Sequence, residues 1–508
     1  MKGPATQIIL RGTEEPCLPW VRRTLSHQDW TALIGALPAQ PGLALVGLWA
    51  DTAQAHALFI EEVSGDILPV STAIVDGSYP ALSPARPAAA WLERMVRDLW
   101  GHSALGGTDD RPWLDHGRWP QTYPNAIRPG PMGPPPEPPE FLPVDGDDLH
   151  QVAVGPVHAG TIEPGHFRFT AQGETVVRLE IRLGYTHKGT LSLMRSKSPR
   201  TAARFAARLS GDSTVAHSIA FARATEAALA VEAPPRAHAL RAVMAEMERV
   251  ANHLGDVGAI CNDAGFAFVL ARFGFHREAM LRAAHAAFGH RLMMDAVVPG
   301  GVAGDIAAGG IGAGGIGAIL AAIAAVEGEM PELIRLYENY SSLTDRVVGT
   351  GTISLALAER FAAGGYVGRA CGRVVDARRM PGYPPYQNLA VAVPNLPEGD
   401  VDARVRIRLA EITESIRLLR ALLGDLPDGK LAVTLPMLSG EGIGCAEGFR
   451  GDIWHWLRID NGQIASVFMR DPSWAQWPLL EVAIGGNIIA DFPLCNKSFN
   501  CSYSGVDL

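Results

Sequence analysis

The chain has 508 residues and a formal net charge of −9, from 44 lysines and arginines and 53 aspartates and glutamates. At about 100–200 residues per domain, this length predicts two to four domains with ample hydrophobic core. Hydrophobic residues make up 47% and charged residues 19%, which excludes a disordered acidic chain and a polytopic membrane protein.

The acidic balance, without a run of five or more basic residues, argues against a nucleic-acid partner. The six cysteines are scattered and form no C-x-x-C pair, which argues against a disulfide scaffold and against a local zinc or iron–sulfur site. The N-terminal segment contains no apolar signal core, so a reducing, cytosolic compartment is expected.

Residues 1–128 are predicted to form a small α/β domain. The runs 43–50 and 56–63 are rich in aliphatic residues and predict strands, whereas residues 88–101 show the spacing of an amphipathic helix. The stretch that follows is too dense in proline for a helix or a central strand. Residues 129–150 are therefore expected to be an extended linker between two domains.

Residues 151–508 are predicted to form a large, helix-rich domain with a peripheral β-sheet, which makes the fold class α+β. Residues 174–187 alternate apolar and polar side chains and predict a strand. Asp460, Asn461 and Gly462 predict the type I′ turn of a later hairpin. Helices are expected at four places: 234–261, 276–295, 316–340 and 404–429.

The uncharged segment from Ile306 to Val326 is long enough to cross a bilayer. Its many glycines weaken a helix by about 1 kcal/mol each relative to alanine, so a glycine-rich loop leading into a buried helix is expected instead. The same segment contains G-x-G-x-x-G at 312–317. Without a preceding strand, this motif does not predict nucleotide binding.

Two groups of polar residues are candidates for function. His158, Glu163 and His166 lie among turn residues, either as ordinary hairpin side chains or as proton donors and relays that work near neutral pH. The second group pairs Glu248 with Arg249 on a predicted helix and Glu447 with Arg450 before the hairpin. A buried Glu–Arg pair is as often structural as functional.

Several segments in order along the chain resemble one family. They include GPVHAG (155–160), EPGHFRF (163–169), GYTHKG (184–189), RAHALRAVMAEMERVANHLGDVG (236–258), EGFRGD (447–452) and DPSWAQWPLLEVAIGGNIIADFPL (471–494). They resemble the large subunit shared by group 4 membrane-bound [NiFe] hydrogenases, such as hydrogenase-4 and formate hydrogenlyase, and the 49-kDa-type subunit of complex I. Residues 40–120 resemble the 30-kDa-type subunit fused ahead of it. The resemblance implies a [NiFe]-hydrogenase-large-subunit-like fold for 151–508.

The resemblance includes one decisive departure. The family's first metal-binding motif, V-C-G-I-C-G-F-A-H-S, aligns with residues 209–218 and places Ser210 and Ser213 at the two cysteine positions. Its second C-x-x-C aligns with Ser502 and Gly505 near the C-terminus. Neutral hydroxyls and a glycine do not replace four soft thiolates. The alignment therefore predicts that the nickel–iron ligands are lost, that no metal is bound and that the chain is not a working hydrogenase.

The complex I resemblance implies a quinone as a candidate ligand. His158 matches the histidine of that family's GPxH loop, while the family's tyrosine has no counterpart in RLSGDST. The implied catalytic residues are His158, Glu163 and His166. The implied quinone or acceptor cavity is lined by residues from three segments: His158, Ser210, Ser213, His217 and Ser502.

The resemblance also implies partners and a location. It predicts an adjacent small subunit with a [4Fe–4S] cluster, antiporter-like membrane subunits, no cofactor bound in this chain, and a peripheral position on the cytoplasmic face of the inner membrane. Electrons from NAD(P)H or ferredoxin would then reach a quinone or similar acceptor, coupled to ion translocation. The alternative is a non-catalytic coupling or scaffold subunit that keeps the fold and its docking surfaces. A hydrogenase with unusual ligands is the least favoured alternative.

Overall fold

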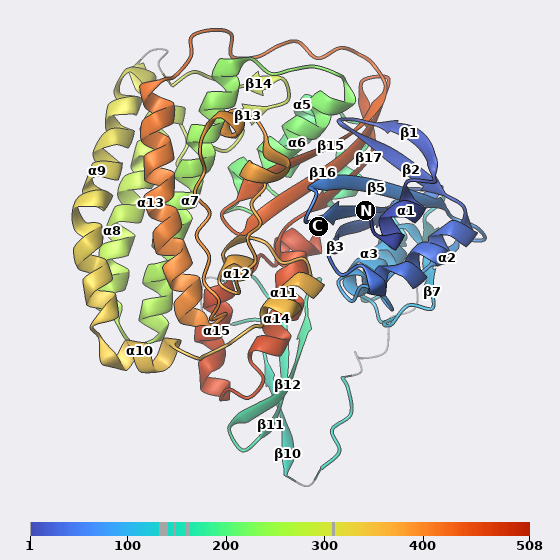
Figure 1. Cartoon of the computed structure of the whole chain (residues 1–508), viewed down its shortest axis with the longest axis horizontal. Coiled ribbons are helices and arrows are strands. Elements are labelled where there is room, and N and C mark those ends of the chain that lie inside the picture. The colour runs from blue at the N-terminus through green and yellow to red at the C-terminus, as the bar shows by residue number, and fades with distance from the viewer. Residues whose placement is uncertain (1, 132–140, 147, 159–161, 307–309) are drawn as a thin grey trace.

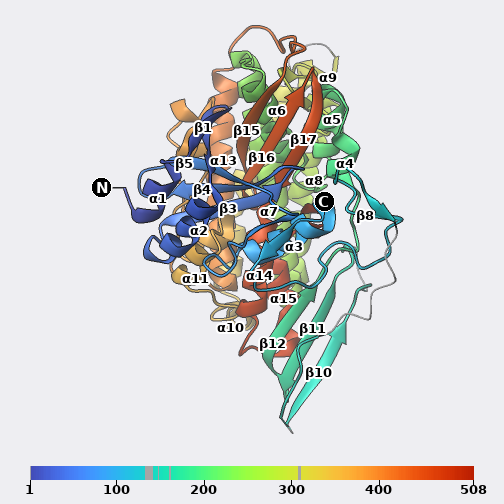
Figure 2. The ribbon, with the colours of Figure 1, turned by 90° about the vertical axis from the view of Figure 1, so that its right-hand side faces the viewer.

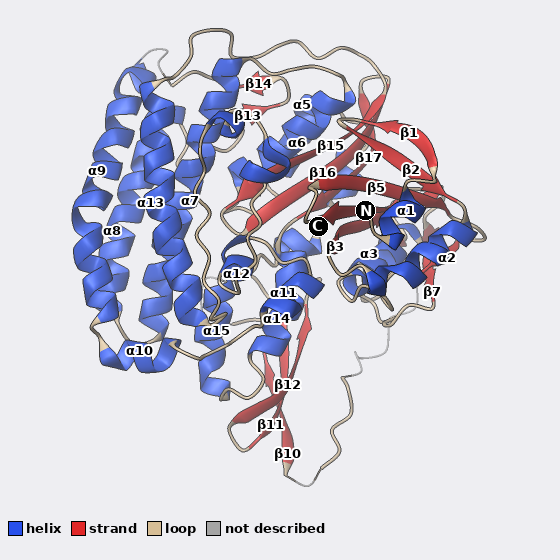
Figure 3. Ribbon diagram, viewed as in Figure 1, coloured by secondary structure: helices blue, strands red, loops and turns tan. Residues whose placement is uncertain are grey.

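The structure is a computed structural model that describes residues 2–131, 141–146, 148–158, 162–306 and 310–508. Long helices gather on one side of the molecule, a three-stranded sheet lies beside them, the N-terminal part packs on its other side, and a second three-stranded sheet projects from the lower end (Figures 1 and 3). This segregation of helices and several small sheets is typical of an α+β protein, as expected.

The N-terminal part is built on a five-stranded sheet in the order β1-β2-β5-β4-β3. The pairing is antiparallel except between β2 and β5. Its elements are α1 (Pro4–Ile9), β1 (Thr13–Cys17), β2 (Trp20–Leu25), α2 (His27–Ala36), β3 (Leu43–Ala50), β4 (Gln54–Glu61), β5 (Asp66–Ala73), β6 (Ser78–Pro80), α3 (Ala89–Trp100) and β7 (Ser103–Leu105). The two predicted strands and the predicted helix are confirmed.

The strand β3 is buried along its whole length, which explains why it is continuously apolar rather than alternating. One face packs against α3. On the other, Trp49 stacks on Phe468 with ring centroids 5.1 Å apart and contacts Trp456 at 5.6 Å. Leu18 adds main-chain hydrogen bonds to Glu441 and Ile443. Apolar burial therefore fixes the N-terminal sheet against the later part of the chain.

The projecting sheet consists of β10 (Leu149–Val154), β11 (His166–Gln172) and β12 (Thr175–Arg182), all antiparallel. It extends away from the rest of the molecule in both views (Figures 1 and 2). Before it, β8 (Gln121–Thr122) pairs with β9 (Gly130–Pro131). Most of the proline-rich part of the expected linker, 132–140, lies outside the described residues.

Four long helices lie side by side at the edge opposite the N-terminal part (Figure 1). They are α7 (Pro235–Asp263), α8 (Ala267–Phe288), α9 (Gly310–Glu338) and α13 (Val401–Gly424), and α7 packs against both α8 and α13. Where a glycine-rich loop was expected, α9 is helical from Gly310, and residues 307–309 lie outside the described range. Among the residues that the structure describes, no helix is both long and apolar enough to span a bilayer.

A three-stranded antiparallel sheet lies between the helices and the N-terminal part. It comprises β15 (Gly440–Gly448), β16 (Gly451–Asp460) and β17 (Gln463–Arg470), and the predicted hairpin turn at Asn461 and Gly462 is confirmed, since both residues have positive φ. The helix α6 (Thr214–Ala228) covers β15. A Cβ atom at Gly442 or Gly444 would collide with the backbone of α6, so these glycines allow the close approach.

Short elements complete the chain and carry its C-terminal segment back to the centre. They are α4 (Thr190–Met194), α5 (Pro199–Ala206), β13 (Val297–Val298), β14 (Gly301–Val302), α10 (Ser341–Val347), α11 (Leu355–Arg360), α12 (Gly365–Arg369), α14 (Ser473–Ala483), α15 (Phe492–Phe499) and α16 (Ser504–Asp507). The segment between α15 and α16 brings Ser502 next to Ser210, shortly before α6 begins.

Candidate functional site

The segment that leads into α6 meets the C-terminal segment in the protein interior. The hydroxyl oxygens of Ser210 and Ser502 are 2.8 Å apart, at hydrogen-bonding distance. The backbone N–H of Gly505 donates to the Ser502 hydroxyl at 3.0 Å, and the N–H of Ser502 donates to the hydroxyl of Ser473 at 2.8 Å. The expected convergence of the two segments is confirmed.

A bidentate ion pair between Arg450 and Asp212 lies beside these serines. The two terminal nitrogens of Arg450 donate to the two carboxylate oxygens of Asp212 at 2.6 and 2.5 Å, and one also donates to the Ser213 hydroxyl at 3.1 Å. The Ser210 hydroxyl donates to Asp212 at 3.1 Å. Burial works to raise the pKa of Asp212, but the guanidinium outweighs it, so the pKa lies below its ordinary value.

The residues at the four aligned ligand positions do not fit a nickel–iron pair. Ser210, Ser213 and Ser502 offer neutral hydroxyls that already contact one another, Asp212 or Arg450, and Gly505 offers no side chain. Such a metal pair requires soft thiolate donors. Within the described ranges, no group of three or more His, Cys, Asp and Glu side chains is placed to hold a metal ion.

His217, in the first turn of α6, is fully buried and held at both ring nitrogens. Nε2 lies 2.9 Å from a carboxylate oxygen of Asp471, and Nδ1 lies 3.0 Å from Nε2 of His455. Burial acts to raise the pKa of Asp471, but the contact with His217 outweighs it and lowers the pKa. Burial and the neighbouring His217 lower the pKa of His455 well below its usual value. The imidazole of His217 is therefore held in one orientation within a buried row of polar contacts that runs from Asp471 through His217 to His455.

The three predicted catalytic residues lie together on the loop between β10 and β11 and at its end. Nε2–H of His158 donates to the carbonyl of Gly165 at 2.8 Å, and Nδ1 of His166 lies 3.3 Å from the carbonyl of Gly155. The carboxylate of Glu163 accepts a hydrogen bond from the backbone N–H of Ser504 at 3.1 Å. The loop is thus attached to the C-terminal segment two residues beyond Ser502.

Glu248 caps the N-terminus of α6 with its carboxyl group. Its two oxygens accept hydrogen bonds from the backbone N–H groups of Val215 at 2.7 Å and Ala216 at 3.1 Å. A helix N-terminus stabilises a carboxylate through these unpaired N–H groups and the helix dipole. Burial nevertheless raises the pKa of Glu248 to about 8, with Asp212 adding to the rise, so the group is mostly protonated at neutral pH.

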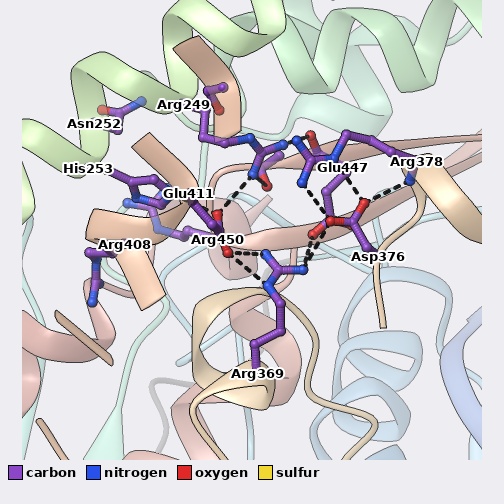
Figure 4. Close-up of polar contacts among 12 residues, drawn as sticks. Arg249, Asn252, His253, Arg369, Asp376, Arg378, Arg408, Glu411, Glu447 and Arg450 are labelled. Carbon is purple, nitrogen blue, oxygen red and sulfur yellow. Dashed lines mark hydrogen bonds and ion pairs between the residues drawn. The ribbon is translucent and has the colours of Figure 1, made fainter. Parts of the chain in front are cut away.

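Glu248, Arg249, Glu447 and Arg450 are all buried, but their ion pairs are not those that adjacency in the sequence suggests. Arg249 pairs with Glu246 and Glu411 and donates to the backbone carbonyls of Glu447 and Gly448. Glu447 accepts from Arg369 at 3.0 Å. Arg249 and Glu447, but not Glu248 or Arg450, belong to one buried charge network, whose members are Glu246, Arg249, His253, Arg369, Asp376, Arg378, Glu411 and Glu447; all but Glu246 are labelled in Figure 4.

Arg249 and Glu447 were singled out from the sequence, but Glu246, Arg369, Asp376, Arg378 and Glu411 were missed. One signal was present in α13. Arg404, Arg408, Glu411 and Ser415 recur at intervals of four, three and four residues, which places them on one face of a helix. All four are buried, so the spacing marks a charged stripe that faces the interior.

Comparisons with known proteins agree with this architecture. Residues 188–255 match the family described as nickel-dependent hydrogenase, and residues 263–439 match the family described as respiratory-chain NADH dehydrogenase, 49 Kd subunit. Formate hydrogenlyase subunit 5 of Escherichia coli (strain K12) is 30% identical over 444 residues, which cover 84% of this chain and 77% of that protein. Hydrogenase-4 component G of the same organism is 28% identical over 460 residues, with coverages of 86% and 78%.

One solved structure shows the same fold. It is a chain of the membrane-bound sulfane sulfur reductase, an archaeal respiratory membrane complex, with a TM-score of 0.66 and 24% identity over 72% of this chain and 100% of that chain. Because identity to formate hydrogenlyase subunit 5 reaches 30% across most of both proteins, the chain belongs to the family of large subunits shared by membrane-bound [NiFe] hydrogenases of the formate hydrogenlyase type and the 49-kDa-type subunits of complex I.

Proposed function

We propose that the chain is a peripheral subunit of a complex I-like membrane-bound complex and passes electrons from an adjacent [4Fe–4S] subunit to a quinone or similar acceptor. In this proposal it lies on the cytoplasmic face of the membrane, and antiporter-like partner subunits couple the reaction to ion translocation. Residues 1–128 act as the 30-kDa-type domain and residues 151–508 as the 49-kDa-type domain. The support is membership of a family whose relatives are subunits of hydrogenase and NADH–quinone oxidoreductase complexes.

The observation that carries the proposal is the attachment of the His158 loop to the C-terminal segment. Glu163 accepts the hydrogen bond from Ser504, and Gly165 lies so close to Tyr503 that a Cβ atom there would be 2.6 Å from the ring. His158 is therefore held beside the segment that carries Ser502. Its Nε2–H is committed to Gly165, so Nδ1 is the atom that remains to meet a ligand.

The chemistry expected of this loop is proton supply to a reduced acceptor. A quinone that takes two electrons also takes two protons. In this proposal His158 donates Nδ1–H to an acceptor oxygen, and Glu163 and His166 of the same loop replace that proton. Burial lowers the pKa of His166, so at neutral pH this residue relays a proton rather than storing one.

The test uses the purified membrane complex with decylubiquinone as acceptor. Replacing His158 with Ala is expected to reduce quinone reduction by about 100-fold or more, the scale of general acid–base catalysis, while native gels show an intact complex. His150→Ala is the matched control, because His150 is an exposed histidine on the neighbouring strand β10. Activity that survives in His158→Ala contradicts the proposal.

The alternative, a non-catalytic coupling subunit, is favoured by one observation. The Ser210 and Ser502 hydroxyls are in direct contact, and Arg450 binds Asp212 with both terminal nitrogens, so the centre of the site is occupied by its own side chains. On this alternative, the wild-type complex reduces no quinone, and His158→Ala acts only on assembly. The same two measurements on the wild-type complex and on His158→Ala separate the two functions.

A further inference from the structure

A cavity of about 310 Å³ opens between α7 and α8, next to the turn that carries Asp212. This volume lies at the lower end of the range, about 300–1,000 Å³, that small-molecule sites occupy. Its walls are mostly apolar, with Met247, Met280, Leu281 and Met293 among the lining side chains. Methionine side chains are flexible and polarisable and adapt to apolar ligands of different shapes.

One cation on the cavity wall has no counter-charge. Arg277 lines the cavity and makes no ion pair or hydrogen bond with any residue that the structure describes. Arg291, on the same cavity, provides the contrast, because it binds both carboxylate oxygens of Glu278 at 2.9 and 2.8 Å. A partly buried guanidinium beside apolar surface favours an anionic partner.

A glycine in α7 provides the space for the Arg277 side chain. A Cβ atom at Gly255 would lie 2.8 Å from Cδ and 2.9 Å from Nε of Arg277, both closer than real Cβ contacts allow. Gly255 lies inside a long helix, where glycine is unfavourable relative to alanine. The Arg277 side chain is thus laid across α7 at a position that any larger residue would block.

The acidic groups at the other side of the cavity do not neutralise Arg277. The carboxylate of Asp212 is already bound by both terminal nitrogens of Arg450. Burial raises the pKa of Glu248 to about 8, so this second acid is largely uncharged at neutral pH. Asn252 uses its amide N–H groups on the carbonyls of Asp212 and Glu248. The cavity therefore combines an apolar wall with one uncompensated positive charge.

We propose that this cavity binds a small amphiphilic monoanion, with its carboxylate on Arg277 and its apolar body among the methionine and leucine side chains. A carboxylate accepts two parallel hydrogen bonds from a guanidinium, which no neutral or cationic head group does. The apolar body displaces water from the hydrophobic wall. The proposal does not depend on electron transfer at His158, because none of its residues belongs to the His158 loop.

The test is calorimetric titration of the purified full-length chain with octanoate, octanol and octylammonium. We expect octanoate to bind with one molecule per chain, octanol to bind at least about tenfold more weakly and octylammonium not to bind. Arg277→Gln is expected to weaken octanoate binding by about tenfold or more and to leave octanol binding unchanged. Equal affinity for octanoate and octanol, or an unchanged octanoate affinity in Arg277→Gln, overturns the proposal.

Two further variants control for folding and for the site. Gly255→Ala keeps the charge but displaces the Arg277 side chain, and alanine favours the helix, so this variant stays folded and still binds octanoate more weakly. Arg291→Gln removes a cavity arginine that is already paired with Glu278, and octanoate affinity should change by less than about twofold. If Arg291→Gln lowers the octanoate affinity as much as Arg277→Gln does, the loss reflects the total positive charge near the cavity rather than a contact with Arg277, and the proposal is wrong.

Discussion

Replacing Glu411 with Gln should destabilise the protein strongly, because it removes one charge from the buried network at its centre (Figure 4). Oε1 of Glu411 accepts a hydrogen bond from Nε of Arg369 at 2.8 Å and lies 2.7 Å from Nη2 of the same guanidinium, and Oε2 lies 2.8 Å from Nε2 of His253. Glu411 and Arg369 are 1% and 0% exposed. Water therefore cannot replace the lost interactions.

The magnitude follows from the charge balance of the network. Its guanidiniums are Arg249, Arg369 and Arg378, and its carboxyl groups are Glu246, Asp376, Glu411 and Glu447. Burial, with the charge of Asp376, raises the pKa of Glu447, so this carboxyl contributes the least negative charge. The positive charges of the three guanidiniums are then nearly balanced by the negative charges of Glu246, Asp376 and Glu411. Glu411→Gln leaves a buried guanidinium short of a partner, which costs about 3–5 kcal/mol.

Glu447→Gln is the matched control, because it exchanges a largely protonated carboxyl group for a neutral amide of the same shape. The expected loss is about 1 kcal/mol, the size of one perturbed hydrogen bond. Urea unfolding followed by tryptophan fluorescence measures both variants against the wild-type protein. If Glu447→Gln destabilises as much as Glu411→Gln, the charge assignment is wrong.

Three other predictions concern metal content, pH and backbone geometry. The purified protein should contain no stoichiometric nickel and evolve no hydrogen from reduced viologen, and elemental analysis that finds about one nickel per chain contradicts the alignment of Ser210 and Ser502 with thiolate positions. The raised pKa of Glu248 means that the folded state holds its proton more tightly than the unfolded state. The free energy of unfolding of the wild-type protein, relative to that of Glu248→Gln, should therefore fall as the pH rises from about 4.5 to about 8. Urea midpoints of the two proteins that differ by the same amount at every pH would show that the pKa of Glu248 is not raised. Gly365 has φ +62°, and a Cβ atom there would overlap the carbonyl of Arg450, so Gly365→Ala should cost about 1–3 kcal/mol. In α9, a Cβ atom at Gly328 would have no neighbour within 4 Å, so Gly328→Ala should instead stabilise the protein by about 0.5–1 kcal/mol. If both variants shift the melting temperature equally, the strain attributed to Gly365 is wrong.

The elements that could be predicted are those whose side chains carry a clear period. The helices α3, α7 and α13 and the hairpin of β16 and β17 lie close to their expected positions, since apolar spacing or turn residues mark them. The strand β15 was missed because Gly440, Gly442 and Gly444 resemble a loop. These glycines are required by the close approach of α6, which is a tertiary contact that no local pattern contains.

The candidate site shows the same division between local and long-range information. The family alignment brought Ser210 and Ser502 together correctly, although 292 positions separate them. It did not reveal Asp212 as the partner of Arg450, or Asp471 and His455 as the partners of His217. Those contacts join residues from different elements, and only the packing of α6 on the sheet places them side by side.

The charges at the centre of the site bear on what it can bind. Four thiolates would carry four negative charges and require a metal pair to balance them. The residues aligned with those positions are neutral, and the Asp212 carboxylate beside them is paired with Arg450 at hydrogen-bonding distance. Neutral hydroxyls and a glycine at the four aligned positions therefore do not supply the negative charge that held a metal pair there. The site is compatible with a neutral acceptor such as a quinone, which needs a hydrogen-bond donor and a proton source, the two roles that we propose for the loop of His158, Glu163 and His166.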